Sequence, residues 1–424
     1  MESKPNSTAW RSILLIIFGA GGGLLFIISG IGILIITAIN EQIVLETNVT
    51  PLIMTLVAST LIAIGLLLLP VTWLSLQRLR GVEFSPVVLP PLRLWAWIAI
   101  PSLWLLSITL ATLYQGLPSA NWFTPFLHFL SIALPIYLVL RVSINRIPLG
   151  SSQRAWGVFA AGMSLSPLLA FIAEITVVAL AVFAVAFYLG MNPELMASVE
   201  RLVAQIQHAP NMDSLVYVIG PLLKNPLTLL VALIFLSFLV PVIEESAKSL
   251  GVWLVADLLQ TPAQGFAMGV LSGAGFALAE SLSASLTADS SWAFTLSVRA
   301  ISSSMHMLAT GLFGWGIAYA RLEKRYLRLV GMTMLAILLH AAWNAGAVFT
   351  VAGGVSVMLS MPDIDFLGSL MSLGGISLLF VLMAGMIVAF FVLNARLRDP
   401  SLPSPPAPKF EETSQTTIDM PKGG

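Results

Sequence analysis

Two adjacent carboxylates and an ammonium lie inside a long apolar stretch of this chain. Glu244, Glu245 and Lys248 fall within the apolar run 228–259, which is long enough to cross a bilayer. A charge at the bilayer centre costs about 2.5–3.5 kcal/mol on insertion scales. Three charged groups within five residues therefore indicate a function. Glu244 and Lys248 are four residues apart and share a helix face, where they can pair. Glu245 points about 100° away and needs another partner.

Polar residues in the next three apolar segments are candidates for that partner. They are Glu280 in segment 264–284, Arg299 and His306 in segment 293–320, and His340 and Asn344 in segment 329–351. Helical rise from the membrane face expected to be cytosolic places the glutamates and histidines about 16–24 Å deep. We therefore expect Glu244, Glu280, His306 and His340 to meet in one layer near the middle of the membrane.

The residue types in this layer are suited to hydrolysis. A glutamate can act as general base on water, while a histidine or an asparagine stabilises the developing oxyanion. Glutamate and histidine also bind Zn²⁺ with one position left open. The chain contains neither H-E-x-x-H nor G-x-S-x-G, so two common hydrolase motifs are absent. Glutamate-activated and metal-activated water both stay open at this point.

Each of these residues also has a structural interpretation. Lys248 can neutralise Glu244, and Glu280 can pair with Arg299, without either pair touching a substrate. Histidines inside membranes often form hydrogen bonds between helices. Glu174 and His128, in two earlier apolar segments, have no evident partner set, and we assign them structural roles. The convergence of two histidines with the glutamates favours the catalytic interpretation of that set.

The elements that must position these residues are membrane helices. The chain is 58% apolar and only 9% charged, whereas soluble domains carry about 25% charged residues. We predict an all-α polytopic protein of the cell membrane with about ten transmembrane helices. The expected spans are 13–39, 52–76, 94–114, 122–140, 156–189, 228–259, 264–284, 293–320, 329–351 and 367–394. The absence of cysteine excludes disulfides, thiolate metal ligands and a cysteine nucleophile.

The spans divide the chain into five regions. They are an N-terminal transmembrane region of unassigned role with four spans (1–155), a long span plus an external amphipathic segment (156–227), a four-span core with the polar set (228–351), a final span (352–398) and a tail (399–424). The tail is rich in proline, serine and threonine, which predicts a disordered cytosolic end. In the external segment, an apolar stripe over 195–206 predicts a helix on the membrane surface.

Four motifs follow one another in consecutive spans of the core. They read Glu244-Glu245-x-x-Lys248, Gly273-x-Gly275-Phe276-x-x-x-Glu280, His306-x-x-x-Thr310-Gly311-x-x-Gly314 and His340-x-x-Trp343-Asn344. Their order and spacing resemble the PrsW family of intramembrane proteases. The related CAAX prenyl endopeptidase and bacteriocin-processing group has E-E-x-x-x-R, whereas here the last position is Ser249 and the basic residue is Lys248.

The resemblance implies a membrane endopeptidase whose substrate is a membrane protein, an anti-sigma factor being the family's substrate type. On this reading Glu244 and Glu245 activate water, and His306 and His340 act as oxyanion or metal partners. The supporting residues are Lys248, Glu280, Arg299 and Asn344. A glutamate mechanism requires no cofactor, whereas a metal mechanism uses Zn²⁺ held by the glutamates and histidines. The lipid bilayer is the other expected partner, and no nucleic acid is expected.

Two other functions fit the same residues. In an ion- or proton-coupled transporter, Glu244, Glu245 and Glu280 would relay protons or cations. A non-catalytic relative would bind membrane partners without cutting them.

Hydrolysis requires a cavity that brings water to the glutamates. We expect one bounded by the four core spans, with room left by Gly273 and Gly275 and a wall formed by Ser302 and Ser303. A lateral opening to lipid would admit the substrate.

The distribution of basic residues predicts the topology. With both termini in the cytosol, 16 of the 20 lysines and arginines are inside, two are outside and two lie within spans. A reporter fused after Gly424 should therefore report a cytosolic location. An external signal from that reporter would contradict the assignment.

Overall fold

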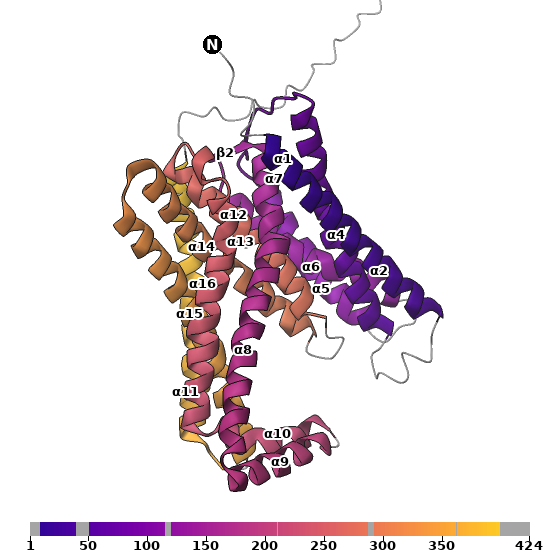
Figure 1. The fold of residues 1–424 in the computed structure, drawn as a ribbon, viewed down its shortest axis with the longest axis vertical. Coiled ribbons are helices and arrows are strands. Elements are labelled where there is room, and N and C mark those ends of the chain that lie inside the picture. The colour runs from indigo at the N-terminus through magenta and orange to yellow at the C-terminus, as the bar shows by residue number, and fades with distance from the viewer. Residues whose placement is uncertain are drawn as a thin grey trace, which may run out of the picture.

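The computed structural model describes residues 9–39, 51–114, 120–209, 211–286, 292–361 and 363–398. These residues form long helices and one two-stranded antiparallel sheet, as shown in Figure 1. The predicted disordered tail, 399–424, lies outside the described residues, as do both chain ends.

The N-terminal part of the chain consists of membrane-length helices and the first strand of the sheet. The elements are α1 (Ala9–Ile16), the π-helical η1 (Ile17–Gly21), α2 (Gly22–Ile39), α4 (Pro51–Leu79), β1 (Pro86–Val88), α5 (Ala96–Tyr114) and α6 (Ala120–Ser143). β1 pairs with β2 (Pro148–Ser151). In α1, Arg11 Nη2 binds Asp257 Oδ2 at 2.8 Å. Burial acts to raise the pKa of Asp257, but the hydrogen bond and charge of Arg11 outweigh it and lower that pKa.

The middle of the chain runs away from the sheet and returns. It comprises α7 (Ser152–Ala160), the π-helical η2 (Ala161–Leu165), α8 (Ser166–Gly190), α9 (Pro193–Gln207), α10 (Met212–Leu223), α11 (Pro226–Ile234) and the π-helical η3 (Phe235–Leu239). α9 and α10 lie at the opposite end of the molecule from β2 (Figure 1). α9 forms where the apolar stripe predicts a helix, and Leu195 and Val203 in that stripe are exposed.

The remaining helices carry the predicted core. They are α12 (Val240–Trp253), the 3₁₀ turn η4 (Ala256–Leu258), α13 (Pro262–Ala284), α14 (Trp292–Glu323), α15 (Tyr326–Ser360) and α16 (Phe366–Leu397). α13 and α14 pack closely, and α15 packs on both α14 and α16. The sixth predicted span ends as a helix at Trp253, six residues earlier than its apolar run.

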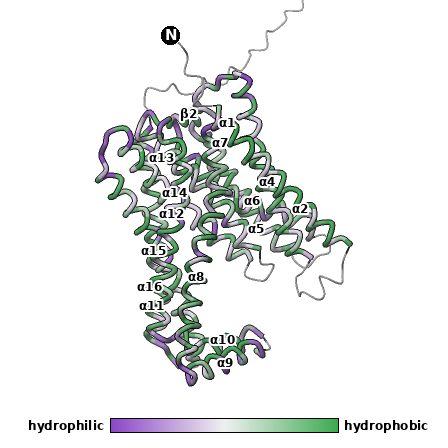
Figure 2. Tube along the Cα trace, viewed as in Figure 1, coloured by the Kyte–Doolittle hydropathy of each residue, from purple (hydrophilic) through white to green (hydrophobic). Residues whose placement is uncertain are grey.

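Nine helical stretches within the described residues are long and apolar enough to cross a membrane. They overlap nine of the ten predicted spans. The other predicted span is α14, which is long enough but less apolar because it carries Arg299, the serines 302–304 and His306. Figure 2 shows hydrophobic residues along α2, α4 and α8, with hydrophilic residues gathered toward the loops. The prediction of an all-α multi-pass membrane protein is confirmed, whereas the orientation stays a prediction.

The helix α13 is enclosed by its neighbours through small residues. A side chain at Gly269 would overlap the carbonyl oxygen of Thr310 in α14, and one at Gly275 would overlap that of Phe159 in α7. Gly273 likewise lies against the backbone of His306. These glycines therefore allow close helix contact. The expectation that Gly273 and Gly275 leave room for a cavity is wrong, because the neighbouring backbones occupy that space.

A π-helical turn and a proline precede the paired glutamates. In η3 the N–H of Val240 donates to Phe235 O, five residues earlier. In the same register the N–H of residue 241 would bond Leu236 O, but Pro241 has no N–H. Asn344 of α15 supplies the missing donor, with its Nδ2 2.7 Å from Leu236 O. An unpaired carbonyl at membrane depth is thereby avoided.

The close packing of α13 predicts how one added methyl group on this helix changes the stability of the protein. Gly269→Ala should destabilise the protein by about 1–3 kcal/mol, because α14 must shift to admit the new Cβ. The control is Gly354→Ala in α15, where a Cβ meets nothing within 4 Å. That variant should unfold at the wild-type temperature or slightly above it. Thermal unfolding in detergent measures both, and equal effects would contradict this account of α13.

Candidate active site

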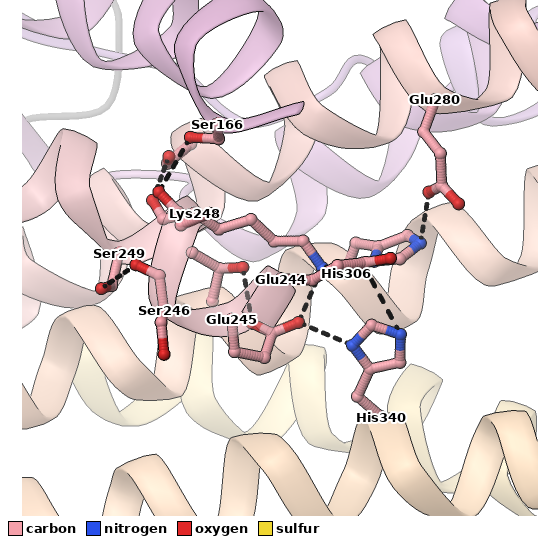
Figure 3. A network of polar contacts seen from close by, with 12 residues as sticks. Ser166, Glu244, Glu245, Ser246, Lys248, Ser249, Glu280, His306 and His340 are labelled. Carbon is pink, nitrogen blue, oxygen red and sulfur yellow. Dashed lines mark hydrogen bonds and ion pairs between the residues drawn. The ribbon is translucent and has the colours of Figure 1, made fainter. Parts of the chain in front are cut away.

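Lys248 of α12 lies at the centre of a polar cluster to which α13, α14 and α15 also contribute side chains (Figure 3). Its ammonium nitrogen is 2.7 Å from Glu245 Oε1 and 2.9 Å from Glu244 Oε2. The same nitrogen is 2.8 Å from His306 Nδ1 and 4.2 Å from the ring centre of Phe276. The side chain of Lys248 is fully buried. The ammonium therefore makes two hydrogen bonds, to Glu245 and His306, and an ion pair with Glu244.

These contacts fix the tautomer of His306. An ammonium can only donate, so His306 Nδ1 accepts the hydrogen bond from Lys248. A neutral ring then carries its proton on Nε2, which lies 2.8 Å from Glu280 Oε2. Arg299 approaches the same carboxylate oxygen to 2.7 Å. The Glu280–Arg299 pair therefore orients His306, as Figure 3 shows for Glu280.

Glu245 orients the second histidine. His340 Nδ1 is 2.9 Å from Glu245 Oε1, and an ionised carboxylate only accepts, so His340 is protonated at Nδ1. Glu245 Oε2 accepts a further bond from Thr310 Oγ1 at 3.0 Å. Glu245 is completely buried, and three donors occupy its two oxygens. The remaining nitrogen of His340, Nε2, is left with a lone pair.

Three of these side chains direct acceptor atoms toward one point. Glu244 Oε2 lies 3.9 Å from His306 Nδ1 and 3.8 Å from His340 Nε2. All three ligand atoms lie within 4.8 Å of one another. Glu244 Oε2 is buried and has no hydrogen-bond partner, because the approach of Lys248 lacks hydrogen-bond geometry. The arrangement resembles a site of three protein ligands around one cation.

The structure brings together most of the residues predicted from the sequence. One cluster contains Glu244, Glu245, Lys248, Glu280, Arg299, His306 and His340. Asn344 lies apart from it and donates to Leu236 O. Thr310, which the third motif contains without an expected role, also belongs to the cluster. Its position four residues after His306, on the same helix face, is a signal that could have found it.

A cavity of about 530 Å³ reaches this cluster from the side of α8. Glu244 and Glu280 form part of its wall, together with Glu174. Apolar residues of α2, α4, α8 and α13 make up most of the rest. The cavity was expected between the four core spans, with Ser302 and Ser303 in one wall, and that expectation is wrong. Both serines are buried, and their hydroxyl groups bond Arg299 O within α14.

Fold and site together define a class, a multi-pass membrane protein with a buried glutamate–histidine cluster suited to a metal ion. A family model described as PrsW family intramembrane metalloprotease matches residues 153–370, slightly more than half of the chain. The chain belongs to this family and is a membrane peptide hydrolase. The resemblance found in the sequence motifs is thereby confirmed. Comparisons with curated proteins and with solved structures found no match.

The buried cation at the centre of the cluster can be tested by removing its charge. Lys248→Met leaves two carboxylates without their cation and should destabilise the protein by about 3–5 kcal/mol in thermal unfolding. Combining it with Glu245→Gln should restore part of the loss. The control is Lys224→Met, which removes an exposed lysine bound to Ser360 Oγ. An unfolding temperature of Lys248→Met equal to that of Lys224→Met would contradict the assigned charge balance.

Proposed function

We propose that this chain is an endopeptidase that hydrolyses a peptide bond of a membrane protein, with Glu244, His306 and His340 as its reaction centre. The observation that carries the proposal is one oxygen of Glu244, which pairs with the charge of Lys248 but has no hydrogen bond. Glu244 Oε2 is buried without a hydrogen bond, faces two histidine nitrogens and belongs to a residue that lines the cavity. A carboxylate in this situation is available to a water or to a metal ion.

The two adjacent glutamates have different roles in this proposal. Glu245 holds His340, Lys248 and Thr310 and has no free oxygen for water. Glu244 has one and is in contact with the cavity. We therefore assign proton transfer to Glu244 and positioning to Glu245. This assignment refines the expectation that both glutamates activate water.

The donor set fits a divalent metal ion. His306 Nδ1 and His340 Nε2 each present a lone pair, while the other nitrogen of each ring lies 2.8–2.9 Å from a glutamate oxygen, of Glu280 and Glu245 respectively. Histidines that bind a metal are usually held in this way by an outer carboxylate. Glu244, His306 and His340 would hold the ion, and their types match a catalytic zinc site with an open position. When bound there, zinc acts as a Lewis acid and makes water a stronger nucleophile at neutral pH.

The same tautomers argue against an oxyanion role for the neutral histidines. A nitrogen that presents a lone pair cannot donate to a developing negative charge. Lys248 is a cationic donor beside one of the rings, since its nitrogen lies 2.8 Å from His306 Nδ1. Lys248 and a metal ion would compete for that lone pair. We infer that Lys248 moves off His306 when the ion binds and then remains paired with Glu245.

In the alternative without a metal ion, Glu244 is the base, and hydrolysis conserves atoms and protons through it. The water oxygen bonds to the peptide carbonyl carbon, and a water proton moves to Glu244 Oε2. The peptide C–N bond then breaks, and the departing nitrogen takes the proton from Glu244. The cluster excludes bulk water, because the side chains that surround Glu244 are almost wholly buried. The proposed substrate is a single-pass membrane protein, and an anti-sigma factor is one candidate of that class.

The proposal is tested with three variants of the centre, Glu244→Gln, His306→Ala and His340→Ala. The full-length proteins are expressed in a strain that lacks its own copy, and new N-termini of membrane proteins are identified by quantitative proteomics. Wild type should generate termini within or beside membrane segments, and each variant should lose them. Purified wild type incubated with zinc alone should retain about one ion, and the variants should retain much less.

The matched control is His208→Ala, because His208 is an exposed histidine at the C-terminal cap of α9, outside the centre. It should keep both the cleavage products and the bound zinc. Products that persist in Glu244→Gln would overturn the catalytic assignment. Products lost in the variants without any zinc binding by wild type would overturn the metal site and leave the glutamate mechanism.

A further inference from the structure

The cavity beside Glu244 has walls from two separate parts of the chain. Phe26 of α2 and Leu61 of α4 line one side, while Leu168 and Phe171 of α8 line another. α2 and α4 precede the residues that match the family model. Its volume of about 530 Å³ lies within the range of sites that hold a ligand. Its apolar walls fit a segment that is itself apolar.

One acidic residue of this cavity has no partner among the described residues. Four glutamates lie well inside the described membrane helices. Glu244 and Glu245 contact Lys248, and Glu280 contacts Arg299. Glu174 of α8 has no hydrogen bond or ion pair among the described residues, and its Oε1 is buried.

An unpaired carboxylate at this depth is costly, so a cation from outside the chain would stabilise its ionised form. The chain's own nearby cations are already engaged, since Lys248 and Arg299 each contact a glutamate of the cluster. A lysine or arginine entering the cavity on another polypeptide would satisfy Glu174. Glu174 lines the same cavity as Glu244, so that residue would lie close to the reaction centre.

We propose that this cavity receives the membrane segment of the substrate, and that Glu174 selects a segment with a lysine or arginine near the bond to be cut. The inference rests on the proposed protease function. A basic residue in the middle of a membrane segment is rare, because its insertion costs about 2.5–3.5 kcal/mol. Recognition of such a residue would therefore give the enzyme a narrow substrate range. The helices α2 and α4 acquire a role in this proposal as the second wall of the substrate site.

The test measures binding, so it does not depend on cleavage. The probes are alanine- and leucine-rich peptides of about 20 residues that span a bilayer. One carries a central lysine, a second carries norleucine there, and a third carries glutamate. Affinities are measured for the full-length protein in lipid nanodiscs. Wild type should bind the lysine peptide about tenfold more tightly than the norleucine peptide, equivalent to ~1.4 kcal/mol.

Variants at position 174 assign the preference to that side chain. Glu174→Gln should reduce the lysine preference to about one. Glu174→Lys should favour the glutamate peptide. The matched control is Glu200→Gln, an exposed glutamate of α9 that should keep the wild-type preference. Equal binding of lysine and norleucine peptides by wild type would overturn the proposal and indicate a cavity filled by lipid.

The cysteine-free chain allows the binding place to be mapped directly. A thiol-reactive group placed beside the lysine of the peptide should label Leu61→Cys, whose position lines the cavity. It should not label Leu66→Cys, an exposed position of the same helix. Equal labelling of the two would overturn the location. A lysine preference lost in Glu174→Gln supports the recognition role even if no peptide is cut, so a failure of the protease proposal is recognised separately.

Discussion

The enclosed ammonium of Lys248 is the interaction on which the polar layer depends. It lies within 2.9 Å of three acceptors, and these belong to α12 and α14. Through Glu245 the same charge is connected to Thr310 of α14 and to His340 of α15. No water reaches the lysine side chain, so the protein alone must compensate its charge. The relative positions of three helices are consequently fixed by one cation.

Each histidine of the centre is held by a different carboxylate. Glu280, supported by Arg299, sets the proton of His306, and Glu245 sets that of His340. Both rings therefore expose the nitrogen that lies toward Glu244. The arrangement separates two tasks that the adjacent glutamates might otherwise share. Glu245 orients His340, and Glu244 remains available for proton transfer.

The sequence was sufficient to predict that these residues meet, because helical rise and helix faces are fixed geometry. Glu244, Glu280, His306 and His340 could be placed at similar depth from their positions in four apolar runs. The partner of Asn344 could not be predicted, since it depends on the π-helical register of η3.

The location of the cavity was not predictable for a different reason. A glycine such as Gly275 has the same sequence pattern whether it opens a space or lets a helix approach, and here it lets a helix approach. The actual cavity takes a wall from α2 and α4, which are distant in sequence from the motifs. Glu174 looked isolated along the chain, and only the tertiary structure places it beside Glu244 and Glu280.

The burial of α13 has a consequence for how the protein is made. Nearly all of α13 is covered by other helices, and it is the least apolar of the nine candidate spans. α14, its main partner, carries an arginine and three consecutive serines at membrane depth. The free energy of inserting either helix into lipid is less favourable than that of α2 or α16, so neither helix on its own would stay stably in a bilayer. Their insertion during synthesis therefore depends on helices already in place, and α13 with α14 would enter as a pair.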